Sequence, residues 1–515
     1  MELPPLPLLD RATEDGESFR LTPATGAAEA QPACPPLTPG RLPLPGEQYR
    51  FHLDMSQCIG CKCCVVACNE QNGNPADIQW RRVGEIEGGT YPDTLRLYLS
   101  MGCNHCLEPT CMTGCPVNAY TKDPLTGIVL HSAERCIGCQ YCTWNCSYGV
   151  PQYNPERGVV GKCDMCYGRL TEGREPACVN ACPEEAIRIE LVNVSEWRRD
   201  YAEQANAPGL PSADDSISTT RVTMRENAPA GTGRVDTARV ESEHPHWPLV
   251  FMTVLTQMAV GAIAAMSAVQ FAGTTRIAHI PAIGVALIAL FALGASTLHL
   301  GRPLFAFRAL SMWRRSWLSR EVLLFSLFEI AAAAYAVLLR THAAASAPAS
   351  LVAAVLGCAA VYASARLYRV AARPAWNTAH TFLEFYLCAA LTGPLAVSLF
   401  ARSFEHKLLL ASSCAAALLA IQQTAKIVSL LRSKTFELRA TGELLRYRFF
   451  GLFAARAGAL VALSLAFALL PLDLSLDCML LIAAIAIEIA GRYLFFVSVV
   501  PKNMAAPYLR RERAA

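Results

Sequence analysis

The sequence predicts an α+β domain with an internal duplication, followed by an all-α bundle of eight transmembrane helices. Seventeen of the 22 cysteines lie between Cys58 and Cys182, and sixteen of them form four sets of similar spacing. Residues 247–500 are rich in Ala and Leu, and only 17% of all residues are charged, which is typical of membrane proteins. A formal net charge of +3 gives no polyelectrolyte character, so no nucleic-acid partner is expected.

Shifts of composition divide the chain into five segments. Residues 205–244 contain turn formers and no apolar periodicity, which is typical of a linker or of an extended tail laid over a partner. The predicted segments are a Pro-rich irregular leader (1–49), the cysteine-rich domain (50–192), the linker or tail (193–245), the transmembrane domain (246–502) and a basic tail (503–515).

Each set of cysteines has a spacing that suits iron–sulfur clusters. In such runs three thiolates bind one cluster and the last cysteine binds a neighbouring one. Four sets predict a chain of electron carriers, and their repetition predicts two duplicated two-cluster ferredoxin-like units. The sets are Cys58, Cys61, Cys64 and Cys68; Cys103, Cys106, Cys111 and Cys115; Cys136, Cys139, Cys142 and Cys146; and Cys163, Cys166, Cys178 and Cys182.

Two other uses of cysteine fit this pattern less well. A disulfide scaffold requires an oxidising compartment and an export signal. The N-terminus shows neither the basic start nor the apolar run of a signal peptide. Structural zinc prefers two CxxC pairs separated by a longer loop, so only the fourth set, taken alone, resembles a zinc site. Cys63 is an extra thiol inside the first set and leaves the choice of ligand there ambiguous.

Eight apolar segments are long enough to cross the bilayer, which takes about 20 helical residues. The last two are separated only by a short turn around Pro471. The predicted spans are Trp247–Gly273, Ile277–Leu298, Glu321–Leu339, Ala349–Leu367, Thr381–Phe400, Leu408–Leu430, Phe449–Leu470 and Leu476–Val500.

Loop charges orient this bundle, because loops rich in Lys and Arg stay in the cytoplasm. The loops after the second, fourth and sixth spans and the C-terminal tail are basic, and the opposite loops carry few charges. With an even number of spans, both termini lie on the basic side. The sequence therefore predicts a multi-pass protein of the cytoplasmic (inner) membrane with the cysteine-rich domain in the cytoplasm.

An electron-carrying domain joined to a membrane bundle predicts a quinone as the partner in the bilayer. His299 ends the second span and Glu321 opens the third, both at the cytoplasmic side. Such a pair could bind the quinone oxygens and exchange protons, although both could also be ordinary residues at wet helix ends. Glu488 and Arg492 are four apart, so they can pair on one helical face. A b-type haem is disfavoured, since only His299 and His380 could lie at matching depth.

The motifs CNHCLEPTCMTGCP, CIGCQYC and GVPQYNPERGVVGKCDMCYGRL resemble the four-cluster iron–sulfur subunit of dimethyl sulfoxide reductase-type molybdoenzymes. From about His246 onward the chain resembles the eight-helix membrane anchor of that system, most specifically in TLHLGRP, LSRE, PAWN and EIAGRYLFF. The resemblance implies that this chain fuses two subunits that are usually separate.

The resemblance also implies a ligand pairing and a quinone site. All sixteen positions are cysteine, so four [4Fe–4S] clusters are implied. The implied sets are Cys58, Cys61 and Cys64 with Cys182; Cys163, Cys166 and Cys178 with Cys68; Cys103, Cys106 and Cys111 with Cys146; and Cys136, Cys139 and Cys142 with Cys115. The implied quinol-binding residues are His299, Gly301, Phe307 and Glu321. Phe305 departs from the family, whose members carry a basic residue there.

The function expected from these features is electron transfer and membrane anchoring within an oxidoreductase complex, without catalytic residues for the substrate in this chain. Electrons would pass between a separate molybdopterin catalytic subunit, the four clusters and menaquinone or ubiquinone in the lipid membrane. The complex would either reduce dimethyl sulfoxide or a similar oxide in anaerobic respiration, or oxidise sulfite as a sulfite dehydrogenase. The cytoplasmic orientation favours sulfite. A redox pump or sensor without a molybdoenzyme partner is the alternative of a different class.

Overall fold

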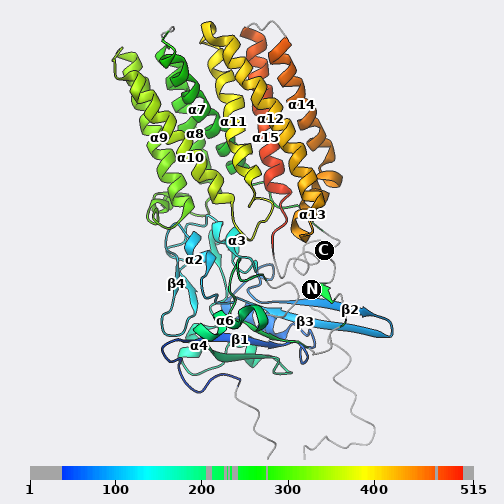
Figure 1. The fold of residues 1–515 in the computed structure, drawn as a ribbon. Helices are drawn as coiled ribbons and strands as arrows, with labels where there is room; N and C mark the ends of the chain where they lie inside the picture. Colours follow the sequence, from blue (N-terminus) through cyan, green and yellow to red (C-terminus); the bar gives the residue numbers. More distant parts are fainter. Residues whose placement is uncertain are drawn as a thin grey trace, which may run out of the picture. The chain divides into compact units, whose positions relative to one another are not determined.

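The structure is a computed structural model that describes residues 37–502, except 205–210, 225–228, 230–231, 235–239, 241, 274–276 and 470–473. It contains small sheets and short helices in the cysteine-rich part, followed by a bundle of long helices (Figure 1). Most of the predicted leader and all of the predicted basic tail lie outside the described residues.

Two three-stranded sheets and two short hairpins form the cysteine-rich domain. In the first sheet, β1 (Glu47–Asp54) pairs antiparallel with β8 (Ile187–Asn193) and parallel with β9 (Arg221–Thr223). In the second, β2 (Arg82–Thr90) pairs with β3 (Asp93–Met101) and β10 (Gly233–Arg234). The hairpins are β4 (Tyr120–Lys122) with β5 (Val129–His131), and β6 (Gln152–Asn154) with β7 (Val159–Gly161).

Alternating apolar residues explain the first sheet. Tyr49, Phe51 and Leu53 of β1 are buried on one face, because successive side chains of a strand point to opposite faces. Phe51 lies opposite Ile189 of β8, and both belong to the core of the domain. The domain also contains the short helices α1 (Cys63–Asn72), α2 (Thr110–Gly114), α3 (Tyr141–Asn145), α4 (Tyr167–Thr171) and α5 (Ala177–Asn180).

The segment 193–245, expected to be a linker or an extended tail, folds back onto the cysteine-rich domain where it is described. It contains α6 (Val194–Gln204) in addition to β9 and β10. Trp197 and Tyr201 of α6 are buried, and the Trp197 indole donates to the Ser218 carbonyl at 2.7 Å. In α6 the two aromatic residues stand among charged ones, and β9 and β10 have only three and two residues. Neither feature produces a periodic pattern in the sequence.

Eight helices of the described residues are long and apolar enough to cross a membrane, as predicted. They lie side by side in one bundle (Figure 1). The helices are α7 (Trp247–Phe271), α8 (His279–Ser296), α9 (Trp317–Arg340), α10 (Ser346–Tyr368), α11 (Ala379–Ser398), α12 (Glu405–Arg432), α14 (Phe450–Leu469) and α15 (Leu474–Val497); α13 (Phe436–Glu443) is a short helix between α12 and α14.

Close packing of backbones holds the centre of the bundle together. A Cβ atom on Gly261 of α7 would lie 2.0 Å from the Ala389 carbonyl oxygen of α11, so only glycine fits at this crossing. Small residues allow such approaches between membrane helices. The helix α9 begins at Trp317, one turn before the predicted start at Glu321. Glu321 therefore lies inside the helix and is buried.

Side chains of the loop between α8 and α9 donate hydrogen bonds to backbone carbonyls of the cysteine-rich domain. Arg302 donates to the Ala133 carbonyl at 2.8 Å, and Ser316 donates to the Gly114 carbonyl at 2.7 Å. The Tyr141 hydroxyl of α3 donates to the Leu367 carbonyl at the end of α10 at 2.7 Å. These buried or half-buried hydrogen bonds hold the cysteine-rich domain against this end of the bundle.

Candidate functional site

The sixteen cysteines gather in four groups, which we name A to D. A nearby thiolate raises the pKa of a thiol, so the effects of the thiols on one another identify neighbours. Burial raises the pKa of the Cys58 thiol, for example, and Cys64 and Cys182 raise it further. Group A contains Cys58, Cys61, Cys64 and Cys182; group B contains Cys68, Cys163, Cys166 and Cys178; group C contains Cys103, Cys106, Cys111 and Cys146; and group D contains Cys115, Cys136, Cys139 and Cys142.

Each group joins three cysteines of one sequence run to the last cysteine of another run. This is the ligand pattern of paired iron–sulfur clusters. Backbone and hydroxyl groups already point at several of the sulfur atoms. The Ala119 N–H donates to Cys115 Sγ at 3.3 Å, the Met165 N–H donates to Cys163 Sγ at 3.4 Å, and Ser100 Oγ lies 3.4 Å from Cys64 Sγ. Donors of this kind stabilise thiolate ligands, so the donor set fits iron–sulfur clusters.

The four groups form a series from A to D. Burial raises the pKa of the Cys178 thiol in group B, and Cys64 of group A contributes to the rise. Burial likewise raises the pKa of Cys163, with a contribution from Cys103 of group C. Groups C and D share two helices, because Cys111 and Cys115 lie at either end of α2, and Cys142 and Cys146 lie within and just after α3.

The two ends of the series differ in exposure. In group A, Cys61 is exposed and Cys58 is half-buried, whereas three thiols of group D are buried. Group D borders the bundle, because Cys139 lines a cavity together with residues of α7, α8, α9 and α10. One end of the series therefore faces the surroundings and the other faces the membrane helices.

The cavity beside group D has a volume of about 1150 Å³ including its open mouth. Its wall is mostly apolar, with Leu249, Phe325 and Leu367 among the lining residues, and its polar groups include Glu321 and His299. Glu321 Oε1 is buried and has no hydrogen-bond partner among the described residues. An apolar cavity with few polar groups is typical of a site for a small organic ligand.

Three of the four predicted quinone residues line this cavity, namely His299, Phe307 and Glu321. Gly301 is not among the lining residues. Its N–H donates to the Gly138 carbonyl at 3.4 Å, and a Cβ atom there would lie 2.2 Å from the Gly158 carbonyl oxygen. Gly301 thus allows the loop to approach the cysteine-rich domain. Phe305 is also outside the lining, and the Arg308 guanidinium lies 4.2 Å from its ring centroid.

The cavity lining also includes residues that were not predicted for this site from the sequence. Cys139 and Trp144 come from the cysteine-rich domain and Tyr368 comes from the end of α10. Trp144 lies between Cys142 of group D and Cys146 of group C in the sequence. The centroid of its ring lies 5.4 Å from that of Trp376 and 5.9 Å from that of Tyr368. A tryptophan inside a cysteine set is the one sequence signal that could have marked this contact.

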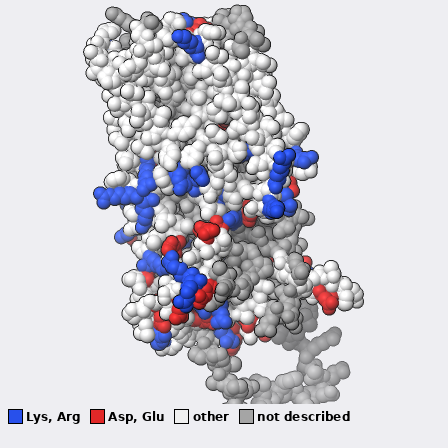
Figure 2. All heavy atoms as spheres, in the orientation of Figure 1, with Lys and Arg blue, Asp and Glu red and all other residues white. Residues whose placement is uncertain are grey.

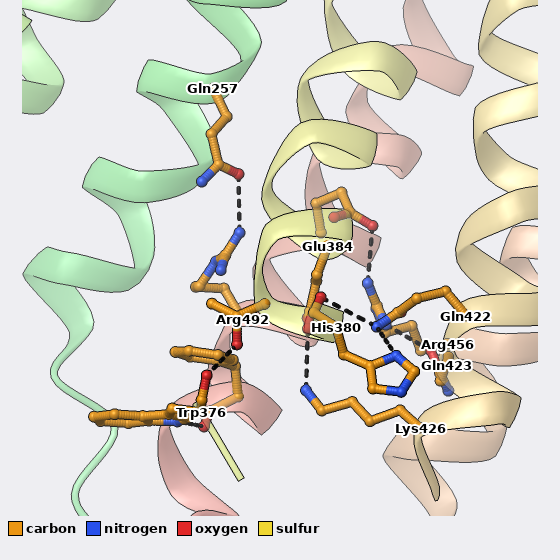
Figure 3. A network of polar contacts seen from close by, with 12 residues as sticks. Gln257, Trp376, His380, Glu384, Gln422, Gln423, Lys426, Arg456 and Arg492 are labelled. Carbon is orange, nitrogen blue, oxygen red and sulfur yellow. Dashed lines mark hydrogen bonds and ion pairs between the residues drawn. The ribbon is translucent and has the colours of Figure 1, made fainter. Parts of the chain in front are cut away.

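A polar network lies between helices α7, α11, α12, α14 and α15 of the bundle (Figure 3). Lys426 forms an ion pair with Glu384 at 3.1 Å, and Arg456 forms one with Glu488 at 3.1 Å. The expected pairing of Glu488 with Arg492 is wrong, because Arg492 donates to Gln257 of α7 at 2.9 Å instead. Inside the bundle, Glu488 and Arg492 therefore each bind a residue of a neighbouring helix rather than each other.

Comparisons with known proteins agree with this division of the chain. The family described as "4Fe-4S dicluster domain" matches residues 95–191, and the family described as "DMSO reductase anchor subunit (DmsC)" matches residues 240–497, half of the chain. One relative is a chain of the anaerobic dimethyl sulfoxide reductase of Haemophilus influenzae. The two sequences are 37% identical over 177 residues, which are 33% of this chain and 85% of that relative.

Two further relatives are named for other activities. The chain is 36% identical to a subunit of the sulfite dehydrogenase of Allochromatium vinosum over 160 residues, 27% of this chain and 67% of the relative. It is 39% identical to the formate dehydrogenase-O iron-sulfur subunit of Escherichia coli over 162 residues, 28% of this chain and 53% of the relative. All are subunits of oxidoreductases, so an electron-transfer role within a complex follows.

The matches cover both parts of the molecule, the cysteine groups and the eight membrane helices. The chain is a multi-pass membrane protein that transfers electrons and anchors its complex. It belongs to the dimethyl sulfoxide reductase anchor subunit (DmsC) family, and it combines that anchor with the iron–sulfur subunit of the same system in one polypeptide.

Proposed function

We propose that the chain carries electrons between a membrane quinone and a separate molybdopterin catalytic subunit through four [4Fe–4S] clusters. The observation that carries this proposal is the cavity in which Cys139 of group D and Glu321 of α9 are both lining residues. A carrier of single electrons and a group that takes up protons then meet in one apolar space, and quinone chemistry requires both.

Each group of four cysteines would hold one cluster. Such clusters accept and release single electrons. The protein contributes the thiolates, the N–H groups that donate to them and the buried cations near them. Lys162 is one such cation, since it is buried, donates to the Cys163 carbonyl at 2.8 Å and counteracts the rise that burial causes in the pKa of Cys103.

A quinone ring would lie between the apolar lining and two proton-accepting groups. His299 Nδ1 is hydrogen-bonded to the Ser296 carbonyl. A carbonyl only accepts, so Nδ1 carries the hydrogen and the lone pair of the neutral ring lies on Nε2. His299 Nε2 and the Glu321 carboxylate would each accept a proton from a bound quinol and pass it to the aqueous side. Menaquinone and ubiquinone share this chemistry.

The catalytic subunit would dock at group A. Cys61 is exposed there, and the neighbouring Ile59 and Val66 side chains are 56% and 57% exposed. Exposed apolar residues beside an electron carrier suit a protein partner, which excludes water from the transfer path. The relatives that are reductase or dehydrogenase subunits support a separate catalytic subunit as this partner.

The cysteine-rich domain would face the cytoplasm. The visible face of the helical part is nearly free of charges, and Lys and Arg gather at the end that adjoins the cysteine-rich domain (Figure 2). Arg302, Arg308 and Arg315 in the loop between α8 and α9 hydrogen-bond that domain. Basic loops remain in the cytoplasm. A reporter fused to the C-terminus is expected to be active in the cytoplasm, and activity only outside would contradict this orientation.

The substrate would be either sulfite, which the complex would oxidise, or dimethyl sulfoxide or a similar oxide, which it would reduce. Sulfite is favoured by the proposed cytoplasmic side and by the relative from Allochromatium vinosum. Anaerobic electron paramagnetic resonance (EPR) on inside-out membranes decides between them. Cluster signals that grow after sulfite is added, and only when this chain is present, support sulfite oxidation. Clusters that stay oxidised with sulfite, but are reduced by quinol and reoxidised by dimethyl sulfoxide, support a reductase.

A further inference from the structure

Arg81 is a buried cation between two of the cysteine groups. Its side chain is 2% exposed, and it precedes β2 directly in the sequence. The guanidinium lies 4.6 Å from the ring centroid of Phe51, and Nη1 donates to Ser100 Oγ at 3.0 Å. Nε and Nη2 have no hydrogen-bond partner among the described residues. Burying a charge with unsatisfied donors is costly unless anions lie nearby.

The groups that act most strongly on the pKa of Arg81 are thiols of groups A and B, which become anionic thiolates when they bind a cluster. Burial lowers the pKa of Arg81, but Cys178, Cys64, Cys163 and Cys68 raise it enough for a net increase. The geometry agrees with this. Arg81 Nη2 and Cys163 Sγ lie 3.4 and 3.6 Å from the point that a Cβ atom on Gly102 would occupy. The Arg81 guanidinium and the Cys163 thiol therefore lie near each other, beside Gly102.

Ser100 extends the contact to group A. Its Oγ accepts a hydrogen bond from Arg81 Nη1 and lies 3.4 Å from Cys64 Sγ. Because the hydroxyl already accepts from the guanidinium, its own hydrogen is free to point at Cys64. Arg81 is thus connected to group A through the Ser100 hydroxyl, and it lies near Cys163 of group B without an intervening hydroxyl.

We propose that Arg81 is a positioning residue for electron transfer, which raises the reduction potentials of both clusters held by groups A and B. A cluster with four thiolate ligands is anionic and gains negative charge on reduction. A fixed positive charge between two such clusters favours the reduced state of each and lessens the repulsion between them. Each of the clusters held by groups A and B can then be reduced even when the other is already reduced. This inference rests on the proposed assignment of the cysteine groups to [4Fe–4S] clusters.

Redox titration of the full complex in membranes, followed by EPR, tests the inference. Arg81→Gln is expected to lower the midpoint potentials of clusters A and B by the equivalent of at least a tenfold change in equilibrium constant, about 59 mV for one electron. Arg81→Lys keeps the charge and is expected to restore most of this shift. The potentials of clusters C and D are expected to stay at the wild-type values. A single Cys→Ser variant in each group assigns each potential to its cluster.

Arg50→Gln is the matched control. Arg50 is also a buried guanidinium of this domain, but its partners are Glu190 at 3.0 Å and the Trp197 ring, so all four potentials are expected to stay unchanged. Equal potentials in wild type and Arg81→Gln, or one equal shift of all four clusters, would overturn the inference.

Two further measurements distinguish a failure of this inference from a failure of cluster assembly and from a failure of the proposed function. If Arg81→Gln fails to assemble its clusters, Ser100→Ala decides, because it removes only a hydroxyl. A lower potential of cluster A in Ser100→Ala supports the inference, and an unchanged one contradicts it. Wild-type membranes that contain no [4Fe–4S] signals would instead refute the proposed function itself.

Discussion

Cys139 and Glu321 line the same cavity, although Cys139 belongs to the cysteine-rich domain and Glu321 lies in the membrane helix α9. The loop between α8 and α9 lies beside this cavity. That loop is anchored to the cysteine-rich domain by Arg302 and Ser316. A change of Glu321 should therefore affect quinone turnover without removing a proposed cluster ligand.

Glu321→Gln removes the carboxylate and keeps the shape of the side chain. If the carboxylate accepts a quinol proton, the rate of cluster reduction by quinol should fall by about 10²-fold or more, while EPR still detects every cluster after chemical reduction. Glu329→Gln is the control, because Glu329 lies on the same helix but is not among the lining residues. Wild-type quinol kinetics in Glu321→Gln would remove Glu321 from the site.

Trp144→Ala tests the contact between the cysteine-rich domain and the bundle. The ring of Trp144 packs against those of His246, Trp376 and Tyr368. Replacing a buried aromatic residue by alanine costs about 3–5 kcal/mol. We expect a lower unfolding temperature of the purified protein in detergent and slower electron exchange with quinol. Trp313→Ala, at a 49% exposed position, should leave both quantities unchanged.

The ion pair between Arg456 and Glu488 predicts a non-additive double mutant. Arg456 and Glu488 are 5% and 2% exposed, so removing one partner leaves a buried charge uncompensated and costs about 3–5 kcal/mol. Arg456→Met and Glu488→Leu should each lower the thermal midpoint, and the double variant should regain part of the loss. Midpoints that simply add in the double variant would show that the two side chains do not interact.

His131 should make the stability of the cysteine-rich domain depend on pH. Burial, with a smaller effect of Lys162, lowers its pKa to about 4, against about 6.5 in the unfolded protein. Between these values the unfolded state takes up the proton first, so stability falls as pH decreases from about 6.5 to about 4, by up to about 1.4 kcal/mol per pH unit. His131→Gln should flatten the unfolding temperature over this window. An equally steep decrease in the variant would assign the effect to other groups.

The sequence predicted the features that depend on composition and spacing. Apolar length was enough to find eight spans, and thiol spacing was enough to identify iron–sulfur chemistry. Features that depend on tertiary contacts were missed. Trp197 and Tyr201 place α6 against the cysteine-rich domain without any periodic pattern, and Arg492 is bound by Gln257 from a distant helix rather than by Glu488 on its own helix. The approach of Gly301 to Gly138 and Gly158 is likewise visible only in three dimensions.

In the proposed function, electrons pass between quinone and the cysteine groups at the cavity of Cys139 and Glu321. The most direct test is anaerobic EPR of membranes that contain the wild-type protein or Glu321→Gln, recorded before and after quinol is added. We expect [4Fe–4S] signals that grow with quinol in the wild type, and much more slowly in the variant, although dithionite reduces both equally. Clusters that dithionite reduces but quinol does not, in the wild type, would contradict the proposed function.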